Sequence, residues 1–166
     1  MRVPTRKPGK YAGLKPDKYI TKAKYDELQQ KLKKLKKYSR PRAIEEVKRL
    51  ALMGDFSENF AYGMAKGRLR GINQRILDIE DRIKRAVIIK PLKNKETVQL
   101  GHQVTLEVNS KQKTYQILGS TETNPLGGII SHNSPIGAKL IGKRAGDIIK
   151  IKLSKKKVNY KIIKIE

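Results

Sequence analysis

Two long stretches of this sequence place apolar residues three and four positions apart, the spacing of an amphipathic helix. The first stretch runs from Tyr25 to Leu50 and the second from Met64 to Val87. If the chain reversed at Ser57, residues equidistant from it would face each other. These pairs are Leu50 with Met64, Tyr38 with Ile76, Leu35 with Ile79, and Leu28 with Ala86. Because each helix has a single apolar stripe, the pattern predicts an antiparallel coiled-coil hairpin about 40 Å long.

The boundaries of the two helices follow from proline and capping residues. Pro16 followed by Asp17 favours a helix start, with Asp17 accepting from free amide groups of the first turn. Pro41 interrupts the first apolar stripe. Because an interior proline removes a backbone hydrogen bond and costs about 3 kcal/mol, we expect a kink or break near Arg40–Pro41.

The region after Val87 changes from helical spacing to short segments rich in Val, Ile, Thr and Tyr, which predicts strands. The predicted strands are Gln103–Val108, Thr114–Leu118, Gly128–Ile130, Ile148–Leu153 and Tyr160–Ile165. Ser134-Pro135 supplies an N-cap and first-turn proline for one short helix, which Gly142 ends. The predicted fold class is therefore α+β, with a hairpin at 17–90, a linker at 91–98, and a small antiparallel sheet with one short helix at 99–166.

The charge of the chain indicates a polyanionic partner. Lys and Arg number 39 against 15 Asp and Glu, a net charge of +24. Nucleic acid is the first candidate partner and an anionic membrane surface the second. Residues 1–16 combine Pro, Gly and cationic residues, which predicts a flexible basic arm.

Several classes of protein are excluded by composition. The absence of cysteine excludes a disulfide framework and a thiolate metal site. No signal-peptide apolar stretch and no run of about 18 apolar residues is present, so we expect a cytoplasmic protein that does not enter a membrane.

The turn between the predicted helices carries two carboxylates. Its sequence is Gly54-Asp55-Phe56-Ser57-Glu58-Asn59. Carboxylate oxygens suit Mg²⁺, but two of them do not complete its coordination sphere, so such a site needs ligands from a second molecule. Alternatively, Asp55 caps the second helix and Glu58 lies in its first turn, where the helix dipole favours negative charge.

Several motifs, in order, resemble the bacterial Gre transcript-cleavage factors. Arg40-Pro41, the turn Gly54–Asn59, Tyr62 and Ile79-Glu80 resemble that family's N-terminal hairpin, whose tip reads G-D-x-x-E-N. The second half resembles its FKBP-like C-terminal domain through Thr114–Ser120, Ile130–Gly137, Leu140–Lys143 and Gly146-Asp147. The resemblance spans about Tyr19 to Glu166.

The resemblance implies a transcription elongation factor with RNA polymerase and nascent RNA as partners. The hairpin would enter the secondary channel of the polymerase and stimulate Mg²⁺-dependent cleavage of backtracked RNA. Asp55 and Glu58 would hold a catalytic Mg²⁺ shared with the polymerase, as in two-metal hydrolysis. The protein would then act as a monomeric stimulating factor and not as an enzyme by itself. The cations expected to contact RNA are Lys33, Lys34, Lys36, Lys37, Lys66, Arg68 and Arg70.

Two features depart from the family pattern. The charge of +24 exceeds what a channel-inserted hairpin needs. Gly63, Gly67 and Gly71 share one face of the second helix, which predicts close approach of the partner arm, close approach of an RNA backbone, or a locally frayed helix. These features keep open a basic RNA-binding protein bound to the ribosome or rRNA, and a regulator that occupies the channel without promoting cleavage. We expect no prolyl isomerase activity.

Overall fold

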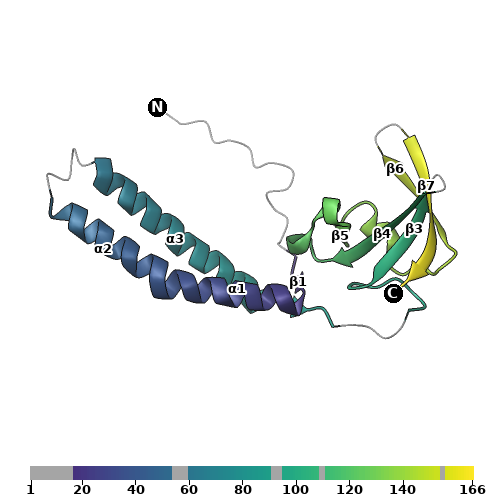
Figure 1. Ribbon diagram of the computed structural model, residues 1–166, viewed down its shortest axis with the longest axis horizontal. Coiled ribbons are helices and arrows are strands. Elements are labelled where there is room, and N and C mark those ends of the chain that lie inside the picture. Colours follow the sequence, from purple (N-terminus) through teal and green to yellow (C-terminus); the bar gives the residue numbers. More distant parts are fainter. Residues whose placement is uncertain (1–16, 54–59, 91–94, 109–110, 154–155) are drawn as a thin grey trace, which may run out of the picture.

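A helical rod projects from a small curled sheet in the computed structural model of this chain (Figure 1). The structure describes residues 17–53, 60–90, 95–108, 111–153 and 156–166. The expected basic arm, 1–16, therefore lies outside the described residues. The α+β fold class predicted from the sequence is confirmed.

The rod is an antiparallel pair of helical arms. The first arm consists of α1 (Lys22–Lys34), the π-helical η1 (Leu35–Ser39) and α2 (Arg40–Ala51), and the second arm is α3 (Phe60–Arg85). Thr21 begins α1 as its N-cap, because its hydroxyl accepts a hydrogen bond from the Lys24 amide at 3.2 Å. The prediction that a helix starts at Asp17 is therefore wrong, and the role of Asp17 is described below.

The first arm remains helical through Pro41. The Arg40 amide donates to the Leu35 carbonyl, five residues earlier, so the turn before Pro41 is wider than an α-helical turn. Pro41 has no amide to donate, and its ring would press on the carbonyl one turn earlier in a regular α-helix. The wide turn accommodates both effects, so of the predicted kink or break the break is wrong, and the local irregularity is a π turn.

The contact between the arms differs from the predicted pairing at its far half. Leu35 with Ile79, and Leu28 with Ala86, belong to one hydrophobic cluster, as predicted. Tyr38 and Met64, however, are 51% and 57% exposed. Tyr38 lies within the π turn, which has more residues per turn than an α-helix, so Tyr38 does not keep its place on the apolar stripe. Residues buried along the contact between the arms include Leu28, Ala43, Ala65, Ile76 and Ile79.

A two-stranded parallel sheet closes the base of the hairpin. It pairs β1 (Tyr19–Ile20) with β2 (Val87–Ile88). The Val87 amide donates to the Lys18 carbonyl and the Ile89 amide to the Ile20 carbonyl, both at 2.8 Å. These strands, which the sequence pattern did not predict, tie the beginning of the first arm to the end of the second.

The second unit is a five-stranded sheet in the order β5-β4-β3-β7-β6. Its strands are β3 (Gln103–Val108), β4 (Lys111–Leu118), β5 (Ile129–Ser131), β6 (Ile148–Leu153) and β7 (Lys156–Ile165). All pairings are antiparallel except β4 with β5, which run parallel. The prediction of an antiparallel sheet is wrong for β5, because the crossover through η2 (Ser120–Glu122) and η3 (Pro125–Gly127) brings the chain back in the same direction.

The sheet encloses its own core with the short helix α4 (Gly137–Leu140). Ser134 accepts a hydrogen bond from the Gly137 amide at 3.0 Å, and Gly142 ends the helix in the left-handed region at φ 78°. Val98, which the sequence placed at the end of the linker, is fully buried in this core. His102 is also buried, and burial lowers the pKa of its imidazole.

Candidate functional site

The far end of the hairpin is where the sequence places the two candidate metal ligands. There α2 ends at Ala51 and α3 begins at Phe60, at the end of the rod away from the sheet (Figure 1). Asp55 and Glu58 lie outside the described residues. Flanking residues are strongly exposed although apolar: Leu52 at 88%, Met53 at 67% and Phe60 at 82%. Such exposure of large apolar side chains is typical of a contact surface for another molecule.

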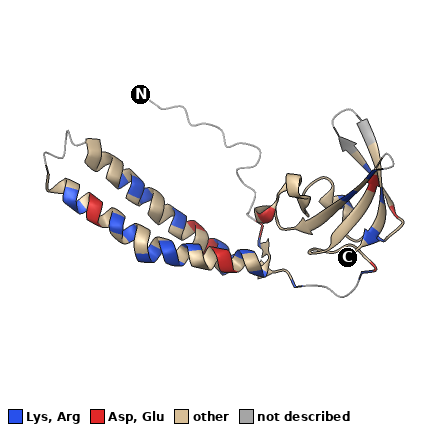
Figure 2. Ribbon diagram, in the orientation of Figure 1, with Lys and Arg blue, Asp and Glu red and all other residues tan. Residues whose placement is uncertain are grey.

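Lys and Arg residues are spread along both arms of the rod (Figure 2). Two of the cations expected to contact RNA form ion pairs between the arms. The Lys36 ammonium lies 2.5 Å from a Glu80 carboxylate oxygen, and the Arg68 guanidinium lies 2.8 Å from Glu46. Because these pairs join α3 to the first arm, Lys36 and Arg68 have a structural role in the hairpin.

Among the described residues, the other candidate cations form no ion pair between the arms. The Lys37 and Lys66 ammonium groups lie 5.4 Å and 5.1 Å from the ring centroids of Tyr38 and Tyr62, within reach of a cation–π contact. Lys33, Lys34 and Arg70 are exposed. Among the described residues, these last three cations form no ion pair, so their charge faces solvent.

The three glycines of α3 lie on an open face. A Cβ atom added at Gly63, Gly67 or Gly71 would meet nothing within 4 Å apart from its own helix. The partner arm therefore does not approach this face, and that prediction is wrong. The α3 helix also continues unbroken through all three positions, so the alternative of a frayed helix is wrong as well.

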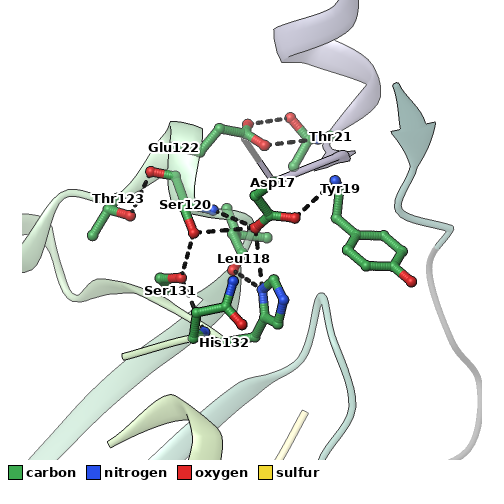
Figure 3. Close-up of polar contacts among 10 residues, drawn as sticks. Asp17, Tyr19, Thr21, Leu118, Ser120, Glu122, Thr123, Ser131 and His132 are labelled. Carbon is green, nitrogen blue, oxygen red and sulfur yellow. Dashed lines mark hydrogen bonds and ion pairs between the residues drawn. The ribbon is translucent and has the colours of Figure 1, made fainter. Parts of the chain in front are cut away.

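A cluster of polar contacts joins the base of the hairpin to the sheet unit, and Asp17 is its centre (Figure 3). Only 5% of the Asp17 side chain is exposed. Its carboxylate accepts hydrogen bonds from the Tyr19 amide at 3.1 Å and from the Ser120 amide at 2.8 Å. The Ser120 hydroxyl donates at 3.2 Å, and Nδ1 of His132 lies 3.4 Å away. The buried carboxylate is thus satisfied by donors from both units.

A second contact between the two units involves Thr21, which directly follows β1 in the sequence. The Thr21 amide and hydroxyl donate to the two carboxylate oxygens of Glu122, at 2.7 Å and 2.5 Å. Hydrogen bonds to an ionised carboxylate are about twice as strong as those between neutral groups. The contact therefore holds the N-cap of α1 against η2 of the sheet unit.

The backbones of the two units also meet directly. A Cβ atom added at Gly119 would overlap the carbonyl oxygen of Tyr19, so only glycine permits this approach. The rings of Tyr19 and His132 meet in a T-shaped arrangement, with ring centroids 5.7 Å apart and planes at 86°. No local sequence pattern predicts this junction, although Gly119-Ser120 ends one of the family motifs in the second half of the chain.

Two features of the described residues bear on the class of site. No group of three or more His, Asp or Glu side chains comes together there in a way that could hold a metal ion. None of the helices in this part of the chain combines the length and the apolar character of a membrane span.

Comparison with known proteins identifies both units. Residues 18–88 match the family described as transcription elongation factor, N-terminal, and residues 93–166 match transcription elongation factor, GreA/GreB, C-term. The transcription elongation factor GreA of Lactococcus lactis subsp. cremoris is 39% identical over 150 residues, which cover 89% of this chain and 96% of that protein. GreA of a Nitratiruptor species is 36% identical over 149 residues, covering 88% of this chain and 91% of that protein.

Solved structures of related proteins include that of GreA factor homolog 1 of Thermus thermophilus. It is 29% identical, covers 89% of this chain and 97% of its own, and has a TM-score of 0.41. The family assignment depends on the sequence matches, which include both units in order and span most of the chain. The chain therefore belongs to the GreA/GreB family of transcription elongation factors.

Proposed function

We propose that this protein inserts its hairpin into the secondary channel of RNA polymerase and stimulates Mg²⁺-dependent cleavage of backtracked nascent RNA. The observation that carries the proposal is the pair of carboxylates, Asp55 and Glu58, in the segment that joins the far ends of the two arms. The 26 residues of α3 correspond to a helix about 39 Å long. A rod of this length can deliver a short acidic segment into a narrow channel while the sheet unit stays outside.

The donor set of this segment fits magnesium in its chemistry. Asp55 and Glu58 offer hard oxygen ligands, of which Mg²⁺ takes one or two from a protein. When bound, the ion would lower the pKa of a water molecule and stabilise charge on the leaving oxygen. Asp55 and Glu58 would hold and orient the site, and the polymerase and an RNA phosphate would supply the remaining ligands. The protein would therefore stimulate a reaction of the polymerase and would not hydrolyse RNA alone.

The exposed cations support a contact with RNA phosphates along the hairpin. Lys33, Lys34 and Arg70 face solvent, so they can meet phosphate without first breaking an ion pair. Lys37 and Lys66 can also turn from their tyrosines at small cost. Such contacts would steer the extruded RNA and depend strongly on salt.

The test is transcript shortening by backtracked polymerase complexes in the presence of Mg²⁺. Asp55→Asn with Glu58→Gln should lower the maximal rate of shortening by about 100-fold or more, because ligands of the reacting centre are lost. Binding to the polymerase should change little. Glu45→Gln, an exposed carboxylate on α2 of the same hairpin, is the matched control and should retain the full rate. Full stimulation by the tip variant would refute the proposal.

The net charge of +24 favours a second candidate function, that of a basic protein bound to the ribosome or rRNA. In that case the protein should sediment with ribosomes at moderate salt, and both tip substitutions should be silent. Sedimentation with polymerase complexes and not with ribosomes would exclude this function. A factor that binds the polymerase without shortening RNA would instead be a regulator that occupies the channel.

A further inference from the structure

The hairpin and the sheet unit have separate hydrophobic cores. The hairpin cluster contains Ile20, Leu28 and Ile79, whereas the sheet cluster begins at Val98. The two clusters share no residue, so burial of apolar surface within each core does not fix the angle between the units. The angle therefore depends on the contacts at the junction.

Those contacts lie on both sides of β1. Asp17 precedes β1 and accepts from Ser120, and Thr21 follows β1 and donates to Glu122 (Figure 3). A single hydrogen bond would act as a hinge, because the rod could rotate about it. Two anchors that flank a two-residue strand restrict that rotation to the line that joins them. The close approach of Gly119 to the Tyr19 carbonyl sets the separation of the two backbones.

The sheet side of the junction is also held in place. The Ser120 hydroxyl lies 2.9 Å from that of Ser131 on β5, and the Asn133 amide donates to Ser131 at 3.0 Å. Ser120 and Glu122 both belong to η2, so the two anchors of the hairpin sit on one short element. A displacement of η2 would therefore move both anchors together.

We propose that Asp17 and Glu122 are positioning residues that hold the hairpin at one angle to the sheet unit. Their effect is amplified by the length of the rod, since a tilt of about 10° at the junction would move the far end of a helix about 39 Å long by about 7 Å. The importance of this angle for RNA cleavage rests on the function proposed above. The existence of the fixed angle does not.

The fixed angle can be measured on the free protein. The chain contains no cysteine, so Lys48→Cys on α2 and Gln103→Cys on β3, both exposed in the native chain, can carry spin labels at defined places. Double electron–electron resonance should give one narrow distance distribution for the native junction. Asp17→Ala with Glu122→Ala should broaden it by several ångströms. Asp26→Ala with Asp81→Ala removes the same charge from surface ion pairs of the hairpin and should leave it narrow.

Glu122→Gln is the conservative variant. Its amide can still accept from the Thr21 amide and donate to the Thr21 hydroxyl, so the narrow distribution should be retained. Should the double alanine variant fail to fold, Glu122→Ala alone, compared with Glu122→Gln, decides the question. A distribution as narrow in Glu122→Ala as in the native protein would overturn the proposal.

In the cleavage assay, the junction and the tip should affect different quantities. If only a fraction of loosened molecules has the competent angle, the apparent dissociation constant rises by the inverse of that fraction. We expect the half-saturating concentration of Asp17→Ala with Glu122→Ala to rise about fivefold while the maximal rate stays unchanged. Asp55→Asn with Glu58→Gln should instead lower the maximal rate and leave the half-saturating concentration unchanged. A fall in maximal rate without a change in half-saturation would overturn the positioning role. Failure of the native protein to stimulate cleavage would refute the proposed function and leave the distance measurement valid.

Discussion

Replacing Ile79 with alanine tests whether apolar packing holds the two arms of the hairpin together. Ile79 is 7% exposed and belongs to a cluster with Leu28 and Ile20. At about 0.8 kcal/mol for each buried carbon group, loss of three side-chain carbons costs about 2.4 kcal/mol. The cavity left behind adds to this cost, so Ile79→Ala should destabilise the hairpin by about 2–5 kcal/mol.

The assay is thermal unfolding followed by the helical circular dichroism signal. Because 1 kcal/mol corresponds to about 4–8 °C for a unit of this size, the transition of the hairpin should fall by at least about 8 °C. Leu77→Ala is the matched control, since Leu77 lies on the same helix and is 59% exposed. If Ile79→Ala shifts the transition no more than Leu77→Ala does, the buried contact is not what joins the arms.

Three further changes should have smaller effects. In a double-mutant cycle, the Glu46–Arg68 pair should show a coupling below about 1 kcal/mol that weakens with salt, because the two side chains are 34% and 61% exposed; a coupling above about 2 kcal/mol would contradict this. Burial lowers the pKa of His102 in the folded chain, so its contribution to stability is present above its unfolded pKa of about 6.5 and is lost as the pH falls below that value. The melting temperature should fall more steeply between about pH 7.5 and pH 5.5 in the native protein than in His102→Gln, and equal slopes would refute the assignment to His102. Gly67→Ala should stabilise the hairpin by about 1 kcal/mol in thermal unfolding, since its added methyl group meets nothing within 4 Å, and a loss of stability would mean that this face is covered.

The parts of the fold that the sequence predicted are those with a regular local pattern. Gln103–Val108 and Ile148–Leu153 have the bounds of β3 and β6, because residues that favour strands are enriched over several consecutive positions there. The two-residue strands β1 and β2 are too short for any such pattern. They exist because the ends of the hairpin meet, which no local sequence encodes. The parallel direction of β5 likewise depends on the path of the crossover.

In the candidate site, too, local motifs were predictable from the sequence and contacts between distant residues were not. The motifs of the second half and the Gly54–Asn59 turn were sufficient to identify the family, because several had the expected order. The role of Asp17 was missed, because its partner Ser120 lies 103 residues away and a Pro-Asp pair also fits a helix start. Tyr38 was misplaced because helical spacing was assumed to continue unchanged up to Pro41. The paired charges of Lys36 and Arg68 could be recognised only once the register of the arms was known.

The wide turn at Leu35–Ser39 has a consequence for the orientation of everything beyond it. In a helix, each inserted or removed residue rotates the following side chains about the helix axis by about 100°. The number of residues in this turn thus sets which side chains of α2 face α3 and which face outward. It does so without changing the length of the arm much. We expect relatives without a proline at the position of Pro41 to lack the extra residue as well. A relative that kept only one of the two would turn a different face of the rod toward its binding partner.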